Sequence, residues 1–354
     1  MKVVQTVYGD ASGGRWQAML NTYEALESQG HEGIIVYGSD NQKQKIDGYR
    51  SWCLNNSGFY DPIAAVKLAL WLRHYKPDVV IAHSGRAVHL FKNAILLARI
   101  KCPVIAMNHS HNVKRTVRAD GFIHITPHVA QRVAEASVQK NINSTAKPQA
   151  VISNLIHLPT QPSVTKAESK ITTLGIMTRL VEYKGTHLAI DAVAQLKQLG
   201  YQVKLQIAGE GEQEQSLIEQ TQRLGLEDDV VFLGWISGQQ KTEFYQSIDI
   251  ALVPTMNDTQ PLAILDAFAW AKPVVASDHI SVQQIIRHNE NGLMAKCADV
   301  EDLVKQLQFC LDHPKNLARY AEQGYRDALQ DYQFSVIAEK LSRFVLECKT
   351  LYQR

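Results

Sequence analysis

Short apolar segments alternate with longer amphipathic segments along most of the chain. The short segments are rich in Val and Ile on both faces, as parallel strands buried on both sides are. The longer segments place apolar residues three and four positions apart, the spacing of a helix that buries one face. This alternation predicts α/β sheets of the doubly wound type, with helices on both faces.

The predicted elements form two consecutive series. The first series has strands at Val3–Val7, Gly33–Tyr37, Val79–Ala82, Val104–Met107 and Gln149–Ile152, and helices near Trp16–Ser28, Ile63–His74, Val88–Ile100 and Val129–Lys140. The second has strands at Thr172–Met177, Lys204–Ala208, Val230–Leu233, Ile250–Val253 and Pro273–Ala276, and helices at Gly185–Leu199, Glu212–Leu224, Pro261–Ala271, Val300–His313, Lys315–Leu329 and Ser335–Leu351.

A polar stretch separates the two series. Residues 159–170 contain two prolines and no apolar periodicity, which is typical of a linker. We therefore expect a Rossmann-like domain at 1–157, a linker at 158–170 and a second Rossmann-like domain at 171–332. Two such domains would leave a cleft between them, and open α/β sheets bind ligands in a crevice at the carboxyl ends of their strands.

Composition indicates an ordinary soluble protein. The 354 residues are 45% hydrophobic and 20% charged, which is enough apolar material for two cores. No segment reaches the roughly 18 uncharged apolar residues of a membrane span, and the start lacks the pattern of a signal peptide. The five cysteines are scattered without a C-x-x-C pair, which favours neither disulfides nor zinc. These features predict a cytoplasmic protein.

The net charge of +2 conceals an asymmetry between the two halves. Residues 1–160 contain 18 Lys and Arg against 10 Asp and Glu, whereas the remainder contains 19 against 25. A basic first half could attract an anionic partner or the inner face of a membrane. Ordinary scatter of charge between two domains is the alternative, and nothing in the pattern indicates a nucleic-acid partner.

A glycine pair follows the first predicted strand. Gly13 and Gly14 would let the backbone approach a ligand, and Arg15 lies where the next helix offers free N–H groups to an anion. A tight strand-to-helix turn explains the same residues. The spacing differs from the G-x-G-x-x-G fingerprint, which argues against a dehydrogenase.

Two loops of the second series also carry candidate chemistry. Arg179 and Lys184 bracket the turn after its first strand, where two cations could grip a diphosphate. Gly209 and Gly211 follow the next strand and suit a sharp turn at its carboxyl end. The alternatives are two solvated surface charges and simple turn chemistry.

The segment from Asp258 to Ala269 is the most informative. Pro261 suits the first position of a helix, which would leave the N–H groups of Leu262 and Ala263 free to bind a phosphate without a metal. Asp266 falls in an otherwise apolar run, where a carboxylate is costly unless it is paired or bound. In the alternative interpretation Asp258 only forms a turn and Asp266 is a solvated acid.

These motifs together resemble the retaining family 4 glycosyltransferases of GT-B fold, also called glycosyl transferases group 1. The family signature E-x7-E corresponds to DTQPLAILDAFAWAKPVVAS, with Asp at both acidic positions. Arg179-Leu180-x3-Lys184-Gly185 and the Ile207–Gly211 loop match the family in the same order, and the resemblance extends over nearly the whole chain. Each Asp is one methylene shorter than Glu, so the donor sugar is left open.

The resemblance implies an enzyme of the hexosyltransferase type that moves a sugar from a nucleotide diphosphate, UDP-linked, to a saccharide or lipid-linked acceptor. It implies retention of configuration, no metal and no cofactor beyond the donor, and a place in lipopolysaccharide or surface polysaccharide synthesis. It also implies that the helix at 333–354 crosses back to an acceptor-binding first domain. By position, the implied roles are leaving-group neutralisation by Arg179 and Lys184, ribose binding by Asp266, sugar binding by Asp258, and base contacts by Trp235 and Ile236.

Histidines follow a strand of the first domain. The family carries a histidine at this place close to the transferring sugar, and His109 aligns best, with His111 second. The H-x-H spacing could also indicate a metal, but no third ligand is apparent. His83 follows the neighbouring strand and is a candidate for acceptor contact. A basic cluster of Lys114, Arg115 and Arg118 lies close by in the sequence, and a solvated helix face explains it equally well.

Two other functions fit the same motifs. A GT-B nucleotide-sugar 2-epimerase would use several carboxylates and histidines in one cleft. A non-catalytic nucleotide-sugar-binding protein would tolerate the two Glu-to-Asp changes.

Overall fold

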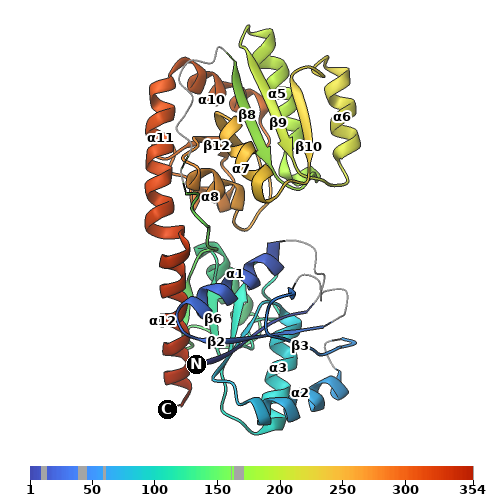
Figure 1. The fold of residues 1–354 in the computed structure, drawn as a ribbon, viewed down its shortest axis with the longest axis vertical. Helices are drawn as coiled ribbons and strands as arrows, with labels where there is room; N and C mark the ends of the chain where they lie inside the picture. The colour runs from blue at the N-terminus through green and yellow to red at the C-terminus, as the bar shows by residue number, and fades with distance from the viewer. Residues whose placement is uncertain (9–13, 39–45, 59–60, 161, 163–170, 354) are drawn as a thin grey trace. The chain divides into compact units, whose positions relative to one another are not determined.

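The chain forms two compact α/β units (Figure 1). The computed structural model describes residues 1–8, 14–38, 46–58, 61–160, 162 and 171–353. The first unit comprises residues 1–155 and 334–354, and the second comprises residues 156–333. Most of the linker predicted at 158–170 lies outside the described residues, as does Gly13.

The first unit contains a parallel sheet of seven strands in the order β3-β2-β1-β4-β5-β6-β7. The strands are β1 (Lys2–Val7), β2 (Glu32–Tyr37), β3 (Ser51–Cys53), β4 (Val79–Ala82), β5 (Val104–Asn108), β6 (Gly121–His124) and β7 (Gln149–Val151). The helices between them are α1 (Gly14–Ser28), α2 (Pro62–Tyr75), α3 (Gly85–Ala98) and α4 (Pro127–Val138).

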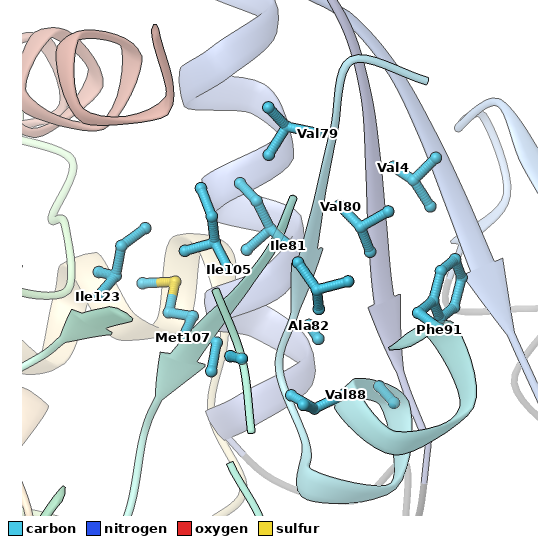
Figure 2. Close-up of a cluster of buried hydrophobic side chains, with 14 of the residues drawn as sticks. Val4, Val79, Val80, Ile81, Ala82, Val88, Phe91, Ile105, Met107 and Ile123 are labelled. Carbon is cyan, nitrogen blue, oxygen red and sulfur yellow. The ribbon is translucent and has the colours of Figure 1, made fainter. Parts of the chain in front are cut away.

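The core of this unit follows from the Val- and Ile-rich strands. Every residue of β4 and β5 is buried, because helices cover both faces of the sheet. Figure 2 shows Ile81 and Ile105 on adjacent strands, with Val88 and Phe91 of α3 in the same cluster.

Side-chain caps fix where the helices begin. The carboxylate of Asp61 accepts a hydrogen bond from the backbone N–H of Ala64, and the hydroxyl of Ser84 accepts one from Ala87. Each cap satisfies one of the N–H groups that the first turn of a helix leaves without a partner. The starts of α2 and α3 are thereby set beside the carboxyl edge of the sheet.

The last helix packs against the first unit. This helix, α12 (Phe334–Gln353), contacts α1. The ring Nε2 of His31 lies 2.7 Å from the hydroxyl of Ser342, and the ammonium of Lys349 lies 2.8 Å from a carboxylate oxygen of Asp78. Residues 334–354 thus belong to the same unit as residues 1–155.

The second unit contains a parallel sheet of six strands in the order β10-β9-β8-β11-β12-β13. The strands are β8 (Thr172–Met177), β9 (Val203–Ala208), β10 (Val230–Gly234), β11 (Ile250–Val253), β12 (Val274–Ser277) and β13 (Leu293–Ala295). The helical segments are η2 (Glu182–Lys184), α5 (Thr186–Gln198), α6 (Glu214–Arg223), α7 (Gly238–Ser247), α8 (Leu262–Ala269), α9 (Ile280–Gln283), α10 (Val300–Asp312), α11 (Pro314–Asp327) and η3 (Ala328–Tyr332).

No helix in the described part of the chain has both the length and the apolar character needed to span a bilayer.

Candidate active site

The candidate donor-binding residues lie at one edge of the second sheet. Strands β9, β8 and β11 are neighbours and run parallel, so the loops that follow them meet at their carboxyl ends. Arg179 and Lys184 come from the loop after β8. Gly209 and Gly211 come from the loop after β9, and Asp258 comes from the loop after β11.

Both glycines after β9 are required by close backbone packing. Gly209 has φ of 143°, and a Cβ there would lie 1.8 Å from the carbonyl oxygen of Thr178. A Cβ on Gly211 would lie 2.3 Å from the carbonyl oxygen of Leu180. The N–H of Thr178 also donates to the Ala208 carbonyl, and that of Leu180 donates to the Glu210 carbonyl. The two glycines therefore let the loop after β9 pack against the backbone of the loop that carries Arg179.

Lys184 and Asp258 form an ion pair across 74 residues of sequence. Their side chains are only 14% and 17% exposed, so both charges are largely removed from water. Gly185 makes this approach possible: its φ is 73°, and a Cβ there would lie 2.1 Å from the carbonyl oxygen of Pro254. The N–H of Met256 donates to the Tyr183 carbonyl at 2.8 Å, which ties the two loops together.

Arg179 lies on the same loop and is more accessible. One of its guanidinium nitrogens, Nη2, donates to the hydroxyl of Tyr183 at 2.8 Å. That hydrogen bond orients the planar guanidinium and uses one of its five N–H donors. The remaining donors can meet an anion in the bidentate geometry that phosphates favour.

Helix α8 starts one residue later than the sequence indicated. Pro261 was predicted at the first helical position, but its ψ of 102° is extended, so it occupies the capping position and Leu262 begins the helix. The prediction was wrong by one residue, and its consequence for the N–H groups is unchanged. The N–H groups of Leu262 and Ala263 belong to the first turn, which has no carbonyl one turn earlier to bond.

Asp266 lies one turn further along α8 and is not a lone solvated acid. Its carboxylate lies 2.8 Å from the ammonium of Lys241, which comes from α7. Tyr245 of the same helix is buried, and burial first and the Asp266 charge second raise its pKa well above the usual value. The ion pair with Lys241 offsets the cost of placing the Asp266 carboxylate in an apolar run.

Lys241, the partner of Asp266, was not predicted from the sequence pattern. It lies in GQQKTEFYQS, a polar helix of which only Phe244 and Tyr245 are buried. Two apolar residues are too few to reveal a helical period.

Trp235 and Ile236 follow β10 at the same edge. The indole of Trp235 is largely exposed, and its backbone N–H donates to a carboxylate oxygen of Glu210 at 3.3 Å. Ile236 is partly buried against the apolar cluster that contains Phe244. An exposed aromatic face held by its own backbone is suited to stacking with a planar ligand.

The first unit holds a chain of hydrogen-bonded polar groups that begins at the buried Gln5 and His83 and ends at the partly buried His109. The ring Nδ1 of His83 lies 2.8 Å from Nε2 of His109, and Nε2 of His83 lies 2.7 Å from Oε1 of Gln5. The two imidazoles are stacked, with ring centroids 5.1 Å apart. His83 and His109 follow the adjacent strands β4 and β5, and Gln5 lies on β1, the other neighbour of β4.

The partners of His83 determine which ring nitrogens carry protons. Because Oε1 of Gln5 is an acceptor, His83 donates through its Nε2–H, and its Nδ1 must then accept. His109 therefore donates through Nε2–H, which leaves its Nδ1 with a lone pair. Burial first and the Arg15 charge second lower the pKa of His109 to about 3, so the ring is neutral at pH 7. A neutral imidazole with a lone pair can accept a hydrogen bond from a hydroxyl group.

Three other residues predicted from the sequence, Gly14, Arg15 and His111, also belong to the first unit. Gly14 and Arg15 are the first two residues of α1. Burial first, then the neighbouring His109 and last the Arg15 charge lower the pKa of His83 well below its usual value. His111 contacts the ring of His128 edge to face. Among the described residues, no group of three or more His, Cys, Asp or Glu could hold a metal ion.

Comparison with known proteins identifies the family. The model of glycosyl transferases group 1 matches residues 159–327, and the model of glycosyltransferase family 4 matches residues 12–145. The lipopolysaccharide core biosynthesis glycosyltransferase LpsE of Rhizobium meliloti is 26% identical over 96% of this chain and 100% of its own length. The lipopolysaccharide core biosynthesis glycosyltransferase LpsD of the same organism is 25% identical over 92% of each chain.

Solved structures bear out the fold. Anabaena HepE, determined in complex with UDP and glucose, superposes with a TM-score of 0.80 over 98% of this chain and 100% of its own, at 19% identity. At that identity the likeness concerns the fold, which is the GT-B fold with two α/β domains that the resemblance predicted. The chain therefore belongs to the group 1 glycosyltransferases, with a family 4 first domain, and is a glycosyltransferase of GT-B fold.

Proposed function

We propose that the protein transfers a sugar, with retention of configuration and without a metal ion, from a UDP-linked donor to a saccharide or lipid-linked acceptor of lipopolysaccharide or surface polysaccharide synthesis. The observation that carries this proposal is the meeting of Arg179, the Lys184–Asp258 pair and the start of α8 at one sheet edge. The names of the lipopolysaccharide core relatives support the pathway, and the UDP and glucose bound by HepE support the donor class.

The leaving group determines the roles of the cations. As the bond between the sugar C1 and the phosphate oxygen breaks, the departing nucleotide diphosphate gains negative charge. Arg179, Lys184 and the N–H groups of Leu262 and Ala263 stabilise that charge, and they are already oriented before reaction. The acceptor oxygen forms the new bond to C1, and its proton passes to a phosphate oxygen of the leaving group. Positive side chains and helix N–H groups thus replace a divalent metal.

The two aspartates divide the recognition of the donor. Asp266 accepts hydrogen bonds from the ribose hydroxyls, and Asp258 accepts them from the sugar hydroxyls. Asp266 pairs with Lys241, and Asp258 pairs with Lys184. Trp235 lies at the carboxyl end of β10 and stacks on the base.

His109 contributes from the first unit. Its Nδ1 accepts a hydrogen bond from a hydroxyl of the transferring sugar, while His83 and Gln5 hold the ring in that tautomer. Both His83 and Gln5 are positioning residues, since they act through His109.

The test is a nucleotide-diphosphate release assay with a panel of UDP-, GDP- and dTDP-sugars, with and without a lipopolysaccharide core acceptor. We expect UDP to be released from a UDP-sugar only when the acceptor is present, and EDTA should not reduce this release. The product should have the same anomeric configuration as the donor by NMR. Complete loss with EDTA that Mn²⁺ restores would contradict the metal-free mechanism. Inversion at C1 would contradict retention.

A further inference from the structure

The first unit exposes a concentration of large apolar side chains on two adjacent helices. Nine such side chains are exposed among its described residues, and five of them belong to α2 and α3. Each of the five is more than half exposed: Ile63, Val66 and Leu70 on α2, and Leu96 and Leu97 on α3. Their spacing on α2, three and four residues apart, places them along one side of that helix.

The two helices that carry these side chains lie together. Helices α2 and α3 pack against each other (Figure 1). Nε of Arg73 donates to the carbonyl oxygen of Ala98 at 3.0 Å. That contact joins the last turn of α2 to the last turn of α3. Leu70 lies one turn before Arg73, and Leu97 adjoins Ala98. We call the surface made by these five apolar side chains and the cations around them the α2–α3 face.

Positive charge surrounds the apolar side chains. Residues 62–119 contain ten Lys or Arg and a single acidic residue, Asp78. That carboxylate lies 2.8 Å from the ammonium of Lys349. Lys67 and Arg73 are exposed on α2 itself, and Lys101 is exposed just beyond the end of α3.

The basic cluster seen in the sequence also contacts α3. Nη1 of Arg118 lies 3.2 Å from Nδ1 of His89 on α3. A Cβ on Gly85 would lie 2.5 Å from Cβ of Arg115. Asp61 at the start of α2 and Asp120, which pairs with Lys92 of α3, flank this stretch, so residues 61–120 contain ten cations against three carboxylates. Exposed apolar side chains and an excess of positive charge therefore occur together on α2 and α3.

We propose that the α2–α3 face docks the protein on the surface of a bilayer that contains anionic lipids. The apolar side chains enter the boundary between headgroups and acyl chains, and the cations meet the lipid phosphates. A second copy of the chain is a poorer occupant, because an isologous contact would set this positive surface against itself. The charge thus favours a partner that is both apolar and negative.

The position of the face relates it to the acceptor side of the enzyme. Ser84, which caps α3, directly follows His83, so α3 begins at the edge of the sheet that carries His83 and His109. This step rests on the proposed function: a lipid-linked acceptor held in the bilayer would present its saccharide near that edge.

The test is co-sedimentation with vesicles of phosphatidylcholine alone and of phosphatidylcholine mixed with phosphatidylglycerol, without donor or acceptor. We expect binding to the mixed vesicles that decreases with salt. The apolar variant Ile63→Ser/Leu70→Ser/Leu97→Ser should bind at least about tenfold more weakly, since binding scales with buried apolar area. The basic variant Lys67→Gln/Lys101→Gln/Arg118→Gln should lose about fivefold per cation, the factor that corresponds to about 1 kcal/mol each.

Matched controls separate this face from the rest of the surface. Val138, Leu346 and Leu351 are exposed apolar residues elsewhere in the same unit, and their triple Ser variant should bind vesicles like wild type. Lys204, Lys305 and Lys315 are exposed in the second unit, and their triple Gln variant should do the same. Lys305 lies on α10 and Lys315 on α11, far along the chain from α2 and α3.

Three results would overturn the proposal. In the first, the apolar variant binds the mixed vesicles as wild type does. In the second, the control variants lose as much binding as the test variants. In the third, light scattering shows a wild-type dimer that the apolar variant converts to a monomer, which would make the face an interface between copies. UDP affinity should stay at the wild-type value in both test variants, so a failure of vesicle binding and a failure of donor binding are told apart.

Discussion

The ion pair between Lys184 and Asp258 allows a sharp test of how the donor site is built. We consider Lys184→Met, which keeps the stem of the side chain, Asp258→Asn, which keeps its shape, and the two together. Each single substitution leaves one charge without its partner in a place that is largely shielded from water. The double variant removes both charges and so restores neutrality.

The burial of the two side chains, 14% and 17% exposed, sets the magnitude. At about 4 Å and an effective dielectric constant of about 20, two unit charges attract by about 4 kcal/mol, and desolvation of both offsets part of this. We expect each single substitution to lower the free energy of unfolding by about 2–3 kcal/mol and the double substitution by about 3 kcal/mol. The coupling energy of the cycle is then about 2 kcal/mol.

The assay is urea-induced unfolding of the four proteins at pH 7, with a matched cycle on an exposed pair. Arg343 and Glu339 lie one turn apart on α12 and are 74% and 65% exposed, so Arg343→Met and Glu339→Gln should couple by only about 0.3–0.5 kcal/mol. If the Lys184–Asp258 cycle gave a coupling no larger than this exposed pair, the reasoning from burial would be refuted.

Three further outcomes follow from individual residues. His109 has a pKa of about 3 in the folded protein against an ordinary value of 6.5, so wild type loses stability as the pH falls from about 6.5 toward 3. The free energy of unfolding in urea should therefore fall between pH 7 and pH 5 by about 2 kcal/mol less in His109→Gln than in wild type. An equal fall in the two proteins would contradict this. Asp266→Asn should weaken UDP binding by about tenfold or more in calorimetry but leave 2′,3′-dideoxy-UDP binding unchanged, since only the ribose hydroxyls are affected; equal losses for both ligands would exclude the ribose role. Gly209→Ala should lower the free energy of unfolding by about 3 kcal/mol, because its Cβ would clash with the Thr178 carbonyl. Gly200→Ala, at φ of 92° with open space around it, should lower it by only about 1 kcal/mol. Equal losses would mean that the clash at Gly209 adds nothing to the backbone strain of a positive φ.

The strands and helices with strong periodicity were predictable from the sequence. Strand β4 matches its predicted bounds, because four consecutive Val, Ile and Ala residues between polar turns have few other uses in a soluble domain. Strands β3 and β13 were missed, since each has only three residues and cannot show a period. Strand β6 was missed as well, because Gly121–His124 contains one strong pair of apolar residues between polar neighbours.

The fold and family were predictable from motif order, and the comparisons confirm both. The pairing of site residues was not. Lys184 meets Asp258 only because Gly185 lets two loops approach, and Asp266 meets Lys241 only because α7 packs beside α8. Gln5 could have been noticed in the sequence, because it is a polar residue within the buried strand β1. The structure explains it by its hydrogen bond to His83.

The most direct test of the central claim is the affinity for nucleoside diphosphate measured by calorimetry in wild type, Arg179→Met, Lys184→Met and Lys197→Met. Lys197 lies near the end of α5 and pairs with Asp229, so it is a lysine of the same unit whose ion pair lies away from the site. With UDP as ligand, Arg179→Met and Lys184→Met should each raise Kd about tenfold or more, because each removes a charged hydrogen bond to the diphosphate, and Lys197→Met should leave Kd unchanged. Wild-type Kd in both Arg179→Met and Lys184→Met would contradict the claim that this edge of the second sheet binds the donor.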